Sequence, residues 1–431
     1  MKFNKWTVAL AAVGVVSLTS AARADEKPSA LQTALSNTTI SGDVSVSANV
    51  GLTKNYSYSP ADGIPFQPIT KENGFNLDVV KLSIAKPEDS TPWASGYEVD
   101  VLFGPDAVAY NTSVNTTSLP DYAIKQAFVT LHTPVGNGLD WKLGVFDSPL
   151  GYETFDGNPN YTHSWGYSVE PTELTGVEAT YTVNSTLTLS GGAVDASGAG
   201  IDNRNGEAGG TLGYGSSWHL GYFGYATLTA PASWGWSAGD ALSVGVLYGY
   251  VYNPAIGGAN GIPAAANDTS GYMDNNQVNY YAGLTFNTPW KQLTGGASFD
   301  FVQNYGGGYS EDSATFTVNA ISLALYGTYK ATDKLSFDAR AEYYENDGYF
   351  SEGDGAYSTE GSGNLVSLTG TVEYDLWANV VSRLELRWDQ NLSYASVPGL
   401  QSGVLLPLAT YDNAVSERES VGLYANIVYK F

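Results

Sequence analysis

The sequence predicts an all-β fold, a transmembrane antiparallel β-barrel of about 16 strands. Three observations lead to this fold class. The chain ends in a strand-like alternation that runs to Phe431, its body divides into segments of the same alternating kind, and the spacers between them are long and short in turn. Transmembrane barrels have short turns at one end and long loops at the other, and an even strand number places both termini at one end.

Sixteen alternating segments follow one another along the chain. They cover residues 39–52, 74–86, 94–103, 122–133, 141–149, 174–184, 186–195, 218–229, 241–253, 276–288, 292–305, 317–331, 334–346, 364–376, 380–394 and 419–431. Residues 207–214 could form a further strand, so 14 or 18 strands remain open alternatives.

The last segment carries apolar residues at its odd positions from Val421 to Phe431. A free C-terminus is normally frayed and polar, so an apolar strand that reaches the last residue needs a partner. We expect it to pair with the first strand, because lipid cannot satisfy the backbone groups of an open sheet edge. Tyr429 and Phe431 are then expected to form the C-terminal signal for the barrel-assembly machinery.

The first 24 residues have the pattern of a secretory signal peptide. Two lysines precede an apolar run over residues 6–18, and the Ala-Arg-Ala at 22–24 fits the cleavage-site rule. The run is shorter than the roughly 20 residues that a spanning helix needs. We therefore expect a short periplasmic segment over residues 25–38 and a barrel over residues 39–431.

The composition excludes several classes of protein. The chain has 43 acidic and 19 basic residues, and this balance argues against nucleic-acid binding, which requires basic patches. It has no cysteine, so disulfides and thiolate metal sites are excluded. Charged residues make up only 14% of the chain, against about 25% in soluble domains, while Gly, Tyr and Trp are abundant. This composition suits a wall between lipid and water.

The two faces of the segments can be separated by their phase. In the segment 380–394, Leu384, Leu386 and Trp388 share one face, and Glu385 shares the other face with arginines and aspartate. In stacked soluble β-sandwiches the apolar face would point to a core; in a barrel of this size it would meet lipid, and the charged face would line water. The regular alternation of spacer lengths favours the barrel.

One stretch resembles a known family. It is Ala127-Phe-Val-Thr-Leu-His-Thr-Pro-Val-Gly-Asn-Gly-Leu-Asp-Trp-Lys-Leu-Gly144, continued by Pro149-Leu-Gly-Tyr-Glu153, Asn158-Pro-Asn-Tyr161 and Thr175-Gly176. Together these residues resemble the OmpL-like outer-membrane β-barrel porins. The resemblance is strongest over residues 122–184. It implies a porin in the outer membrane of a Gram-negative-type bacterium, surrounded by lipid and lipopolysaccharide, and it supplies no residue-level mechanism.

A barrel of about 16 strands leaves an aqueous channel, and its chemistry is selection. The charged residues that we expect to line the pore are Lys81, Glu98, Asp100, Glu178, Asp300, Arg340, Glu373, Arg383, Glu385 and Arg387; further inward acids are Asp338, Glu342, Asp375 and Asp389. The excess of acids predicts a weak preference for cations. The long spacer 150–173 could fold inward as a constriction, with Glu153, Asp156, Glu170 and Glu173 as its acidic candidates.

Two interpretations of the inward arginines stay open. Arg340, Arg383 and Arg387 could face the acids of an inward loop and set up a field across the pore. They could instead pair with acids on neighbouring strands and brace the wall, where pairing near water contributes only about 0–1 kcal/mol.

We expect passive diffusion of small hydrophilic solutes and ions, with two alternatives. Inward tyrosines Tyr281, Tyr326, Tyr344 and Tyr424 could form a track for sugars in a substrate-specific channel. A plugged structural or adhesive barrel is the other alternative. A homotrimer is compatible with either, and the sequence does not identify the solute.

Catalysis is not expected. The sequence has no H-E-x-x-H and no P-loop motif. The Gly235-Trp-Ser237-Ala-Gly239 stretch matches G-x-S-x-G, but a nucleophile elbow needs a helix after it, and here a strand is expected. We therefore expect no catalytic residue, no metal and no cofactor.

Overall fold

The computed structural model describes residues 37–52, 73–89, 91–110, 121–197, 220–250, 276–303, 309–311, 314–316, 319–346, 363–392 and 419–431. The barrel strands are β1 (Thr39–Gly51), β2 (Gly74–Lys86), β3 (Ser95–Phe103), β4 (Tyr122–Thr133), β5 (Leu139–Asp147), β6 (Glu173–Thr182), β7 (Leu187–Val194), β8 (Gly221–Thr229), β9 (Ala241–Tyr250), β10 (Asn276–Asn287), β11 (Leu293–Gln303), β14 (Asn319–Lys330), β15 (Leu335–Asn346), β16 (Gly363–Trp377), β17 (Val380–Asn391) and β18 (Glu419–Lys430). The expected signal peptide and the ambiguous residues 207–214 lie outside the described residues.

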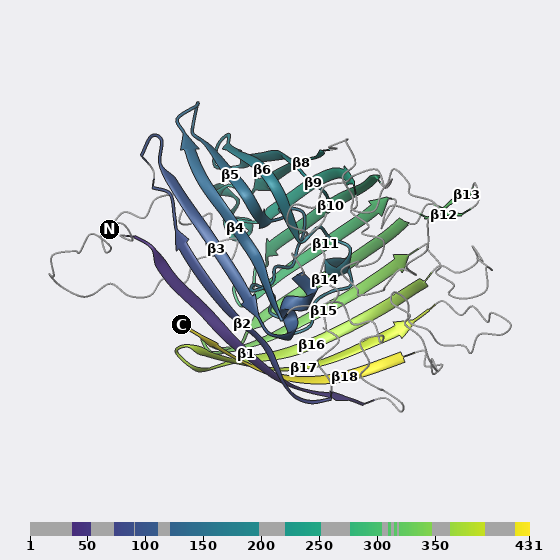
Figure 1. Cartoon of the computed structure of the whole chain (residues 1–431). Coiled ribbons are helices and arrows are strands. Elements are labelled where there is room, and N and C mark those ends of the chain that lie inside the picture. Colours follow the sequence, from purple (N-terminus) through teal and green to yellow (C-terminus); the bar gives the residue numbers. More distant parts are fainter. Residues whose placement is uncertain are drawn as a thin grey trace.

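The strands close into one antiparallel barrel of 16 (Figure 1). Each strand pairs with its neighbours in chain order, and β18 pairs with β1 from Asp43↔Lys430 to Gly51↔Gly422. At the seam the Phe431 amide donates to the Gly42 carbonyl at 2.9 Å, and the Gly42 amide donates to the Phe431 carbonyl at 3.0 Å. Closure at the C-terminal strand and the predicted strand number are thus confirmed. A separate pair, β12 (Tyr309–Glu311) and β13 (Ala314–Phe316), lies outside the barrel sheet.

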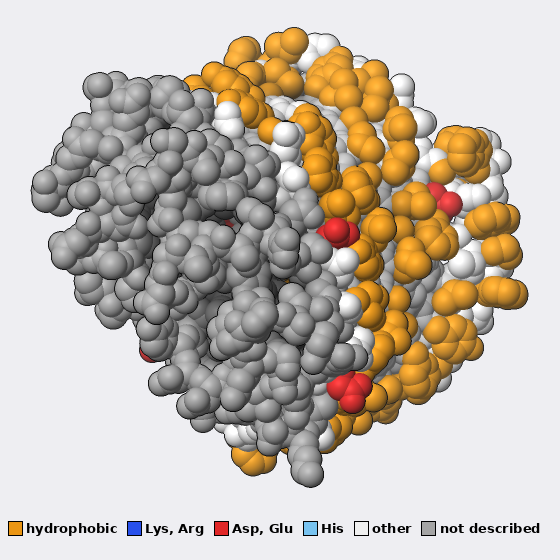
Figure 2. Space-filling model, turned by 90° about the vertical axis from the view of Figure 1, so that its right-hand side faces the viewer, with side chains coloured by type: hydrophobic (Ala, Val, Ile, Leu, Met, Phe, Trp, Pro, Cys, Tyr) orange, Lys and Arg blue, Asp and Glu red, His pale blue; other side chains and the backbone are white. Residues whose placement is uncertain are grey.

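The apolar side of each strand faces outward. On β16 and β17, Leu368 and Leu386 are 51% and 50% exposed, whereas Ser367 and Glu385 are fully buried. Hydrophobic side chains predominate on the described part of the wall in Figure 2, with a few acidic side chains among them. In a soluble globule the apolar side would be the buried one. The exposure therefore decides between the barrel and the stacked sandwiches, and it agrees with a wall that meets lipid.

Short connections at one end carry exposed tryptophans. Trp93, Trp234, Trp236 and Trp290 lie in these connections and Trp377 ends β16, and each is at least 58% exposed. Tryptophan is enriched where a barrel crosses the membrane–water interface, so these side chains mark one such boundary. Ser237 ends the 3-10 helix η4 (Ala232–Ser237) in one of these connections, and a strand follows it. The G-x-S-x-G stretch is therefore a turn and not a nucleophile elbow.

Two strands carry bulges that turn an additional polar residue toward the inside. The register between β1 and β2 shifts at Ser45/Val46, so Asp78 is the extra residue of a bulge on β2. The register between β3 and β4 shifts at Asp100/Val101, so Lys125 is the extra residue of a bulge on β4. Both side chains are nearly fully buried. A bulge inserts one residue into the alternation and re-aims a side chain, so a strict period of two cannot locate it.

Candidate functional site: a segment folded across the barrel

The connection between β5 and β6, residues 148–172, lies inside the barrel (Figure 1). Its Tyr161 hydroxyl contacts Ser47 on β1 and Asp78 on β2, both at 2.9 Å. Its Val169 carbonyl accepts a hydrogen bond from Asn279 on β10 at 3.1 Å. Strands so far apart around the ring can be touched together only from within. We call residues 148–172 the inward segment.

Two fully buried arginines hold the carbonyl groups of the inward segment. Arg340 on β15 donates to the Thr162 carbonyl at 2.6 Å and to the His163 carbonyl at 3.0 Å. Arg387 on β17 donates to the same His163 carbonyl at 2.6 Å. The segment has little regular structure, so its backbone groups need such partners when they are buried. The planar guanidinium suits this task because it offers five donors in a fixed fork.

Both arginines are neutralised by acids. Arg340 pairs with Glu342 on its own strand at 2.9 Å and with Glu153 of the inward segment at 3.0 Å. Arg387 pairs with Asp389 at 2.9 Å. At Arg340 the structure combines the two interpretations left open by the sequence, because one wall acid and one segment acid share this cation. The ion pairs of Arg387 and Arg383 are with acids of the wall.

Carboxylates on the wall accept hydrogen bonds from the segment's amide groups. Glu385 on β17 accepts from the Tyr161 amide at 2.6 Å and from the Thr162 amide at 3.0 Å. Glu342 accepts from the Trp165 amide at 2.8 Å. Asp389 accepts from the Trp165 indole at 2.9 Å. Residues 161–165 are therefore held through both amides and carbonyls, much as a strand is held by its neighbours.

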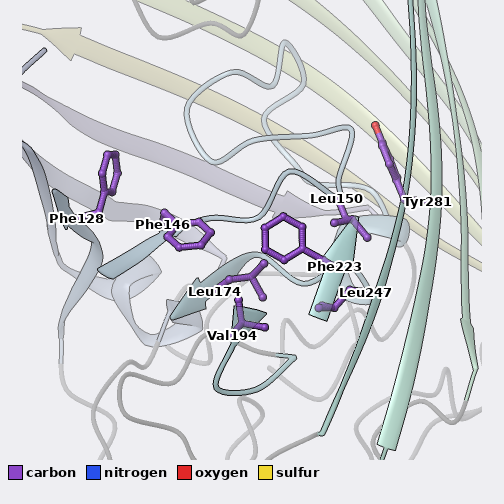
Figure 3. Packing of buried hydrophobic residues seen from close by; sticks show 8 residues of the cluster. All are labelled: Phe128, Phe146, Leu150, Leu174, Val194, Phe223, Leu247 and Tyr281. Atoms are coloured by element: carbon purple, nitrogen blue, oxygen red, sulfur yellow. The ribbon is translucent and has the colours of Figure 1, made fainter. Parts of the chain in front are cut away.

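An apolar cluster holds the beginning of the inward segment on the other side of the lumen. Leu150 packs among inward side chains of the strands β4 to β10, namely Phe128, Phe146, Leu174, Val194, Phe223, Leu247 and Tyr281 (Figure 3). All of these side chains are buried, from 0% to 8% exposed. Full burial of one leucine stabilises by about 1.5–3 kcal/mol. The inward segment is thus held by apolar packing near its beginning and by charged hydrogen bonds at residues 161–165.

The inward tyrosines pack against the segment. Tyr326 stacks on Tyr152 with ring centroids 4.3 Å apart. Tyr344 lies 5.7 Å from the Trp165 ring, and Tyr424 lies 5.7 Å from the Tyr161 ring. Tyr281, Tyr344 and Tyr424 are each at most 6% exposed. A sliding track for sugars needs open aromatic faces, so this geometry speaks against the track at these tyrosines.

The remaining sequence-predicted charges are placed as follows. Lys81 pairs with Asp100 at 3.0 Å and also contacts Asp156 of the inward segment. Glu373 pairs with Arg383 at 2.8 Å between neighbouring strands. Glu178 lies 3.8 Å from Lys142. Glu98 lies two residues before Asp100 on β3 and is half-buried.

Glu173 is the first residue of β6 and not part of the connection, which ends one residue earlier. Its carboxylate pairs with Lys125 at 3.0 Å, and Lys125 also pairs with Asp147 at 2.6 Å. Sequence reasoning overlooked Lys125 and Asp78, because both lie at bulges where the alternation is broken. Sequence reasoning also missed that the backbone of the inward segment comes close to β14 at Gly166. A Cβ on this glycine would lie 2.7 Å from Ser322 Oγ.

Two acids of the inward segment differ in charge. Burial would raise the pKa of Glu153, but the Arg340 guanidinium and His163 outweigh burial and hold it at about 2. Burial, with the nearby Asp300 carboxyl, raises the pKa of Glu170 well above its usual value. Glu153 is therefore the charged partner of Arg340, whereas the surroundings of Glu170 favour its protonated form, and Glu170 accepts a hydrogen bond from the Tyr152 amide at 3.1 Å.

Alkaline pH is expected to loosen the inward segment. The raised pKa of Glu170 means that its contribution to anchoring is complete below its unfolded pKa of about 4.3 and is lost as the pH rises through the folded value. Ionisation of Glu170 would place a buried negative charge beside the Asp300 carboxyl. Single-channel current fluctuations should therefore grow from pH 5 to pH 10. Glu170→Gln should make the fluctuations independent of pH; an unchanged pH profile in that variant would contradict the assignment.

Comparison with known proteins identifies the family of this chain. Its sequence matches the family described as beta-barrel porin-2, OmpL-like, over residues 37–404. The chain belongs to this family. The resemblance noted in the sequence is thereby confirmed, and the protein is a porin of the outer membrane of Gram-negative bacteria. Among curated proteins, none matches this sequence.

Solved porin structures share the fold at low sequence identity. The channel DcaP of Acinetobacter baumannii aligns with a TM-score of 0.56 at 13% identity, covering 91% of this chain and 97% of that one. The anion-selective porin from Comamonas acidovorans aligns at 0.53 and 9% identity, covering 91% and 99%. OmpT of Vibrio cholerae, in its trimer form, aligns at 0.52 and 10% identity, covering 91% and 99%. At this identity the likeness shows the fold alone.

Proposed function

We propose that this porin is a narrow diffusion channel for small hydrophilic solutes and ions, in which the inward segment sets the size limit. The observation that carries this proposal is the attachment of the segment to strands around the ring, from β1 and β2 to β10 and β14–β17. A loop held across the lumen reduces the cross-section that solutes can use. Water-filled space beside the segment then decides what passes.

A weak preference for cations is part of the proposal. Acidic groups are in excess among the partly exposed charges that the described inner face presents. The acids are Asp43, Glu98, Asp147, Asp156 and Glu373, and the bases are Lys81, Lys142 and Arg383. The strongest pairs, around Arg340 and Arg387, are fully buried, so they brace the segment and add little to the field in the water. Rings of acidic side chains favour cations in channels.

Partners follow from the outer wall and from the C-terminal strand. The apolar outer face fits membrane lipid and lipopolysaccharide, and Tyr429 and Phe431 stay 48% and 51% exposed at the end of β18, where the barrel-assembly machinery could bind them. A homotrimer is a further part of the proposal. It is supported by the trimer form of OmpT, whose fold is similar.

Reconstitution in a planar bilayer tests the channel directly. Purified protein should produce step-like conductance, and a salt gradient should give a reversal potential of the sign expected for cation preference. Glu98→Gln should weaken this preference, and Lys142→Gln should strengthen it, because each removes one partly exposed charge from the inner face. Absence of steps over many insertions would contradict the channel; an anion preference would contradict only the selectivity.

A further inference from the structure

A cluster of metal-ligating side chains lies at the rim with the short connections, away from the inward segment. Glu88 follows β2 in the connection to β3, His132 is the penultimate residue of β4, and Asp140 is the second residue of β5. His132 and Asp140 face each other across the β4–β5 ladder. The His132 amide also donates to the Ala94 carbonyl at 2.9 Å, which brings the β2–β3 connection alongside.

The three side chains present one ligand atom each within 4.8 Å of one another. His132 Nδ1 lies 2.5 Å from Asp140 Oδ1. Their side chains are 16% and 19% exposed, so an ion can reach them from water without crossing a packed layer. Ligand atoms around a tetrahedral ion with bonds of about 2.0–2.1 Å are separated by about 3.3 Å. Small side-chain movements would bring all three atoms into that range.

Glycines make room for this cluster, and one of its carboxylate oxygens is buried without a hydrogen bond of regular geometry. Gly138 has φ +104°, and a Cβ on it would overlap the His132 ring. A Cβ on Gly96 would lie 2.6 Å from the Glu88 amide and 2.7 Å from Thr130 Oγ1. Glu88 Oε2 and Thr130 Oγ1 are both buried without a hydrogen bond of regular geometry, although the Glu88 carboxyl lies close enough to Thr130 and Asp140 to interact with both. Buried carboxylate oxygens are ordinarily hydrogen-bonded or bound to an ion.

We propose that Glu88, His132 and Asp140 form a binding site for a divalent transition metal of the Zn²⁺ class. Two carboxylates offset the charge of the dication. One imidazole favours Zn²⁺, Co²⁺ or Ni²⁺ over Mg²⁺ and Ca²⁺, which prefer all-oxygen ligands. The ion takes the place of the proton between His132 and Asp140, water completes its coordination, and Thr130 Oγ1 can donate to a bound carboxylate. The bound metal would join the two hairpins β2–β3 and β4–β5 at the rim.

Titration calorimetry of the full chain in detergent, with ZnCl₂ as the probe, tests this site. Wild-type protein should bind one Zn²⁺ per chain, and a large excess of Mg²⁺ should not displace it. Glu88→Gln and His132→Asn should each weaken binding by about tenfold or more, because each removes a ligand atom. Bound Co²⁺ should show visible absorption bands that disappear in His132→Asn.

The matched control is Asp89→Asn, which removes an exposed acid from the same connection and should leave Zn²⁺ binding unchanged. Heat-modifiable migration on a gel confirms that every variant is a folded barrel. The proposal is overturned if wild-type protein shows no saturable Zn²⁺ binding, if Mg²⁺ competes equally, or if Glu88→Gln and His132→Asn both bind as the wild type does. None of these readouts depends on conductance, so the site can fail while the channel stands.

Discussion

Replacing Arg340 with alanine should release the inward segment and raise the single-channel conductance. Arg340 is fully buried and holds Glu153, Glu342 and the Thr162 carbonyl. Without it, the buried carboxylates of Glu153 and Glu342 lose the guanidinium that they share, and breaking a buried pair in this way costs about 3–5 kcal/mol. The barrel itself is held by strand pairing, so the loss should appear as detachment of the segment.

Single-channel recording measures this effect, and limited proteolysis of residues 148–172 in detergent supports it. Arg383→Ala is the matched control, because Arg383 forms its ion pair with Glu373 on a neighbouring strand and not with an acid of the inward segment. The control should keep wild-type conductance and show only a modest change of selectivity. Wild-type conductance together with protease resistance in Arg340→Ala would show that the segment is held without this arginine.

Leu386→Arg should destabilise the barrel by about 2–4 kcal/mol. Leu386 lies in the middle of β17 on the outer face and is 50% exposed. An arginine there would place its charge in the hydrocarbon, where it lacks water. Urea unfolding in lipid vesicles, followed by tryptophan fluorescence, measures the free energy of unfolding.

Ser382→Arg provides the comparison for this prediction. Ser382 lies on the same strand and the same face, close to the end of β17, where an arginine costs only about 0–1 kcal/mol. The difference in the free energy of unfolding between the two variants separates the effect of depth in the bilayer from the general cost of adding an arginine. Equal stability of the two variants would mean that the outer face of β17 does not lie in lipid.

The strands and their facing could be predicted because both depend on local pattern. All sixteen predicted strand ranges agree with the structure to within three residues at each end. Apolar and polar side chains alternate along the strands, as Leu386 and Glu385 do on β17. Turn residues between strands determine the backbone conformation over only a few positions. The prediction of pore-lining charge was less complete, because Asp78 and Lys125 lie where a bulge interrupts the period of two.

The sequence by itself determined a closed barrel with an apolar outer face. The period of two sets the two faces of each strand, and the apolar C-terminal strand needs a partner strand, which closure supplies. Only the tertiary structure decided what its inner charges do. Glu385 was expected to face water, and it is buried beneath the Tyr161 and Thr162 amides, 224 and 223 residues away in sequence. Such contacts depend on the path of a segment without periodicity, and no pattern along the chain encodes where that segment meets the wall.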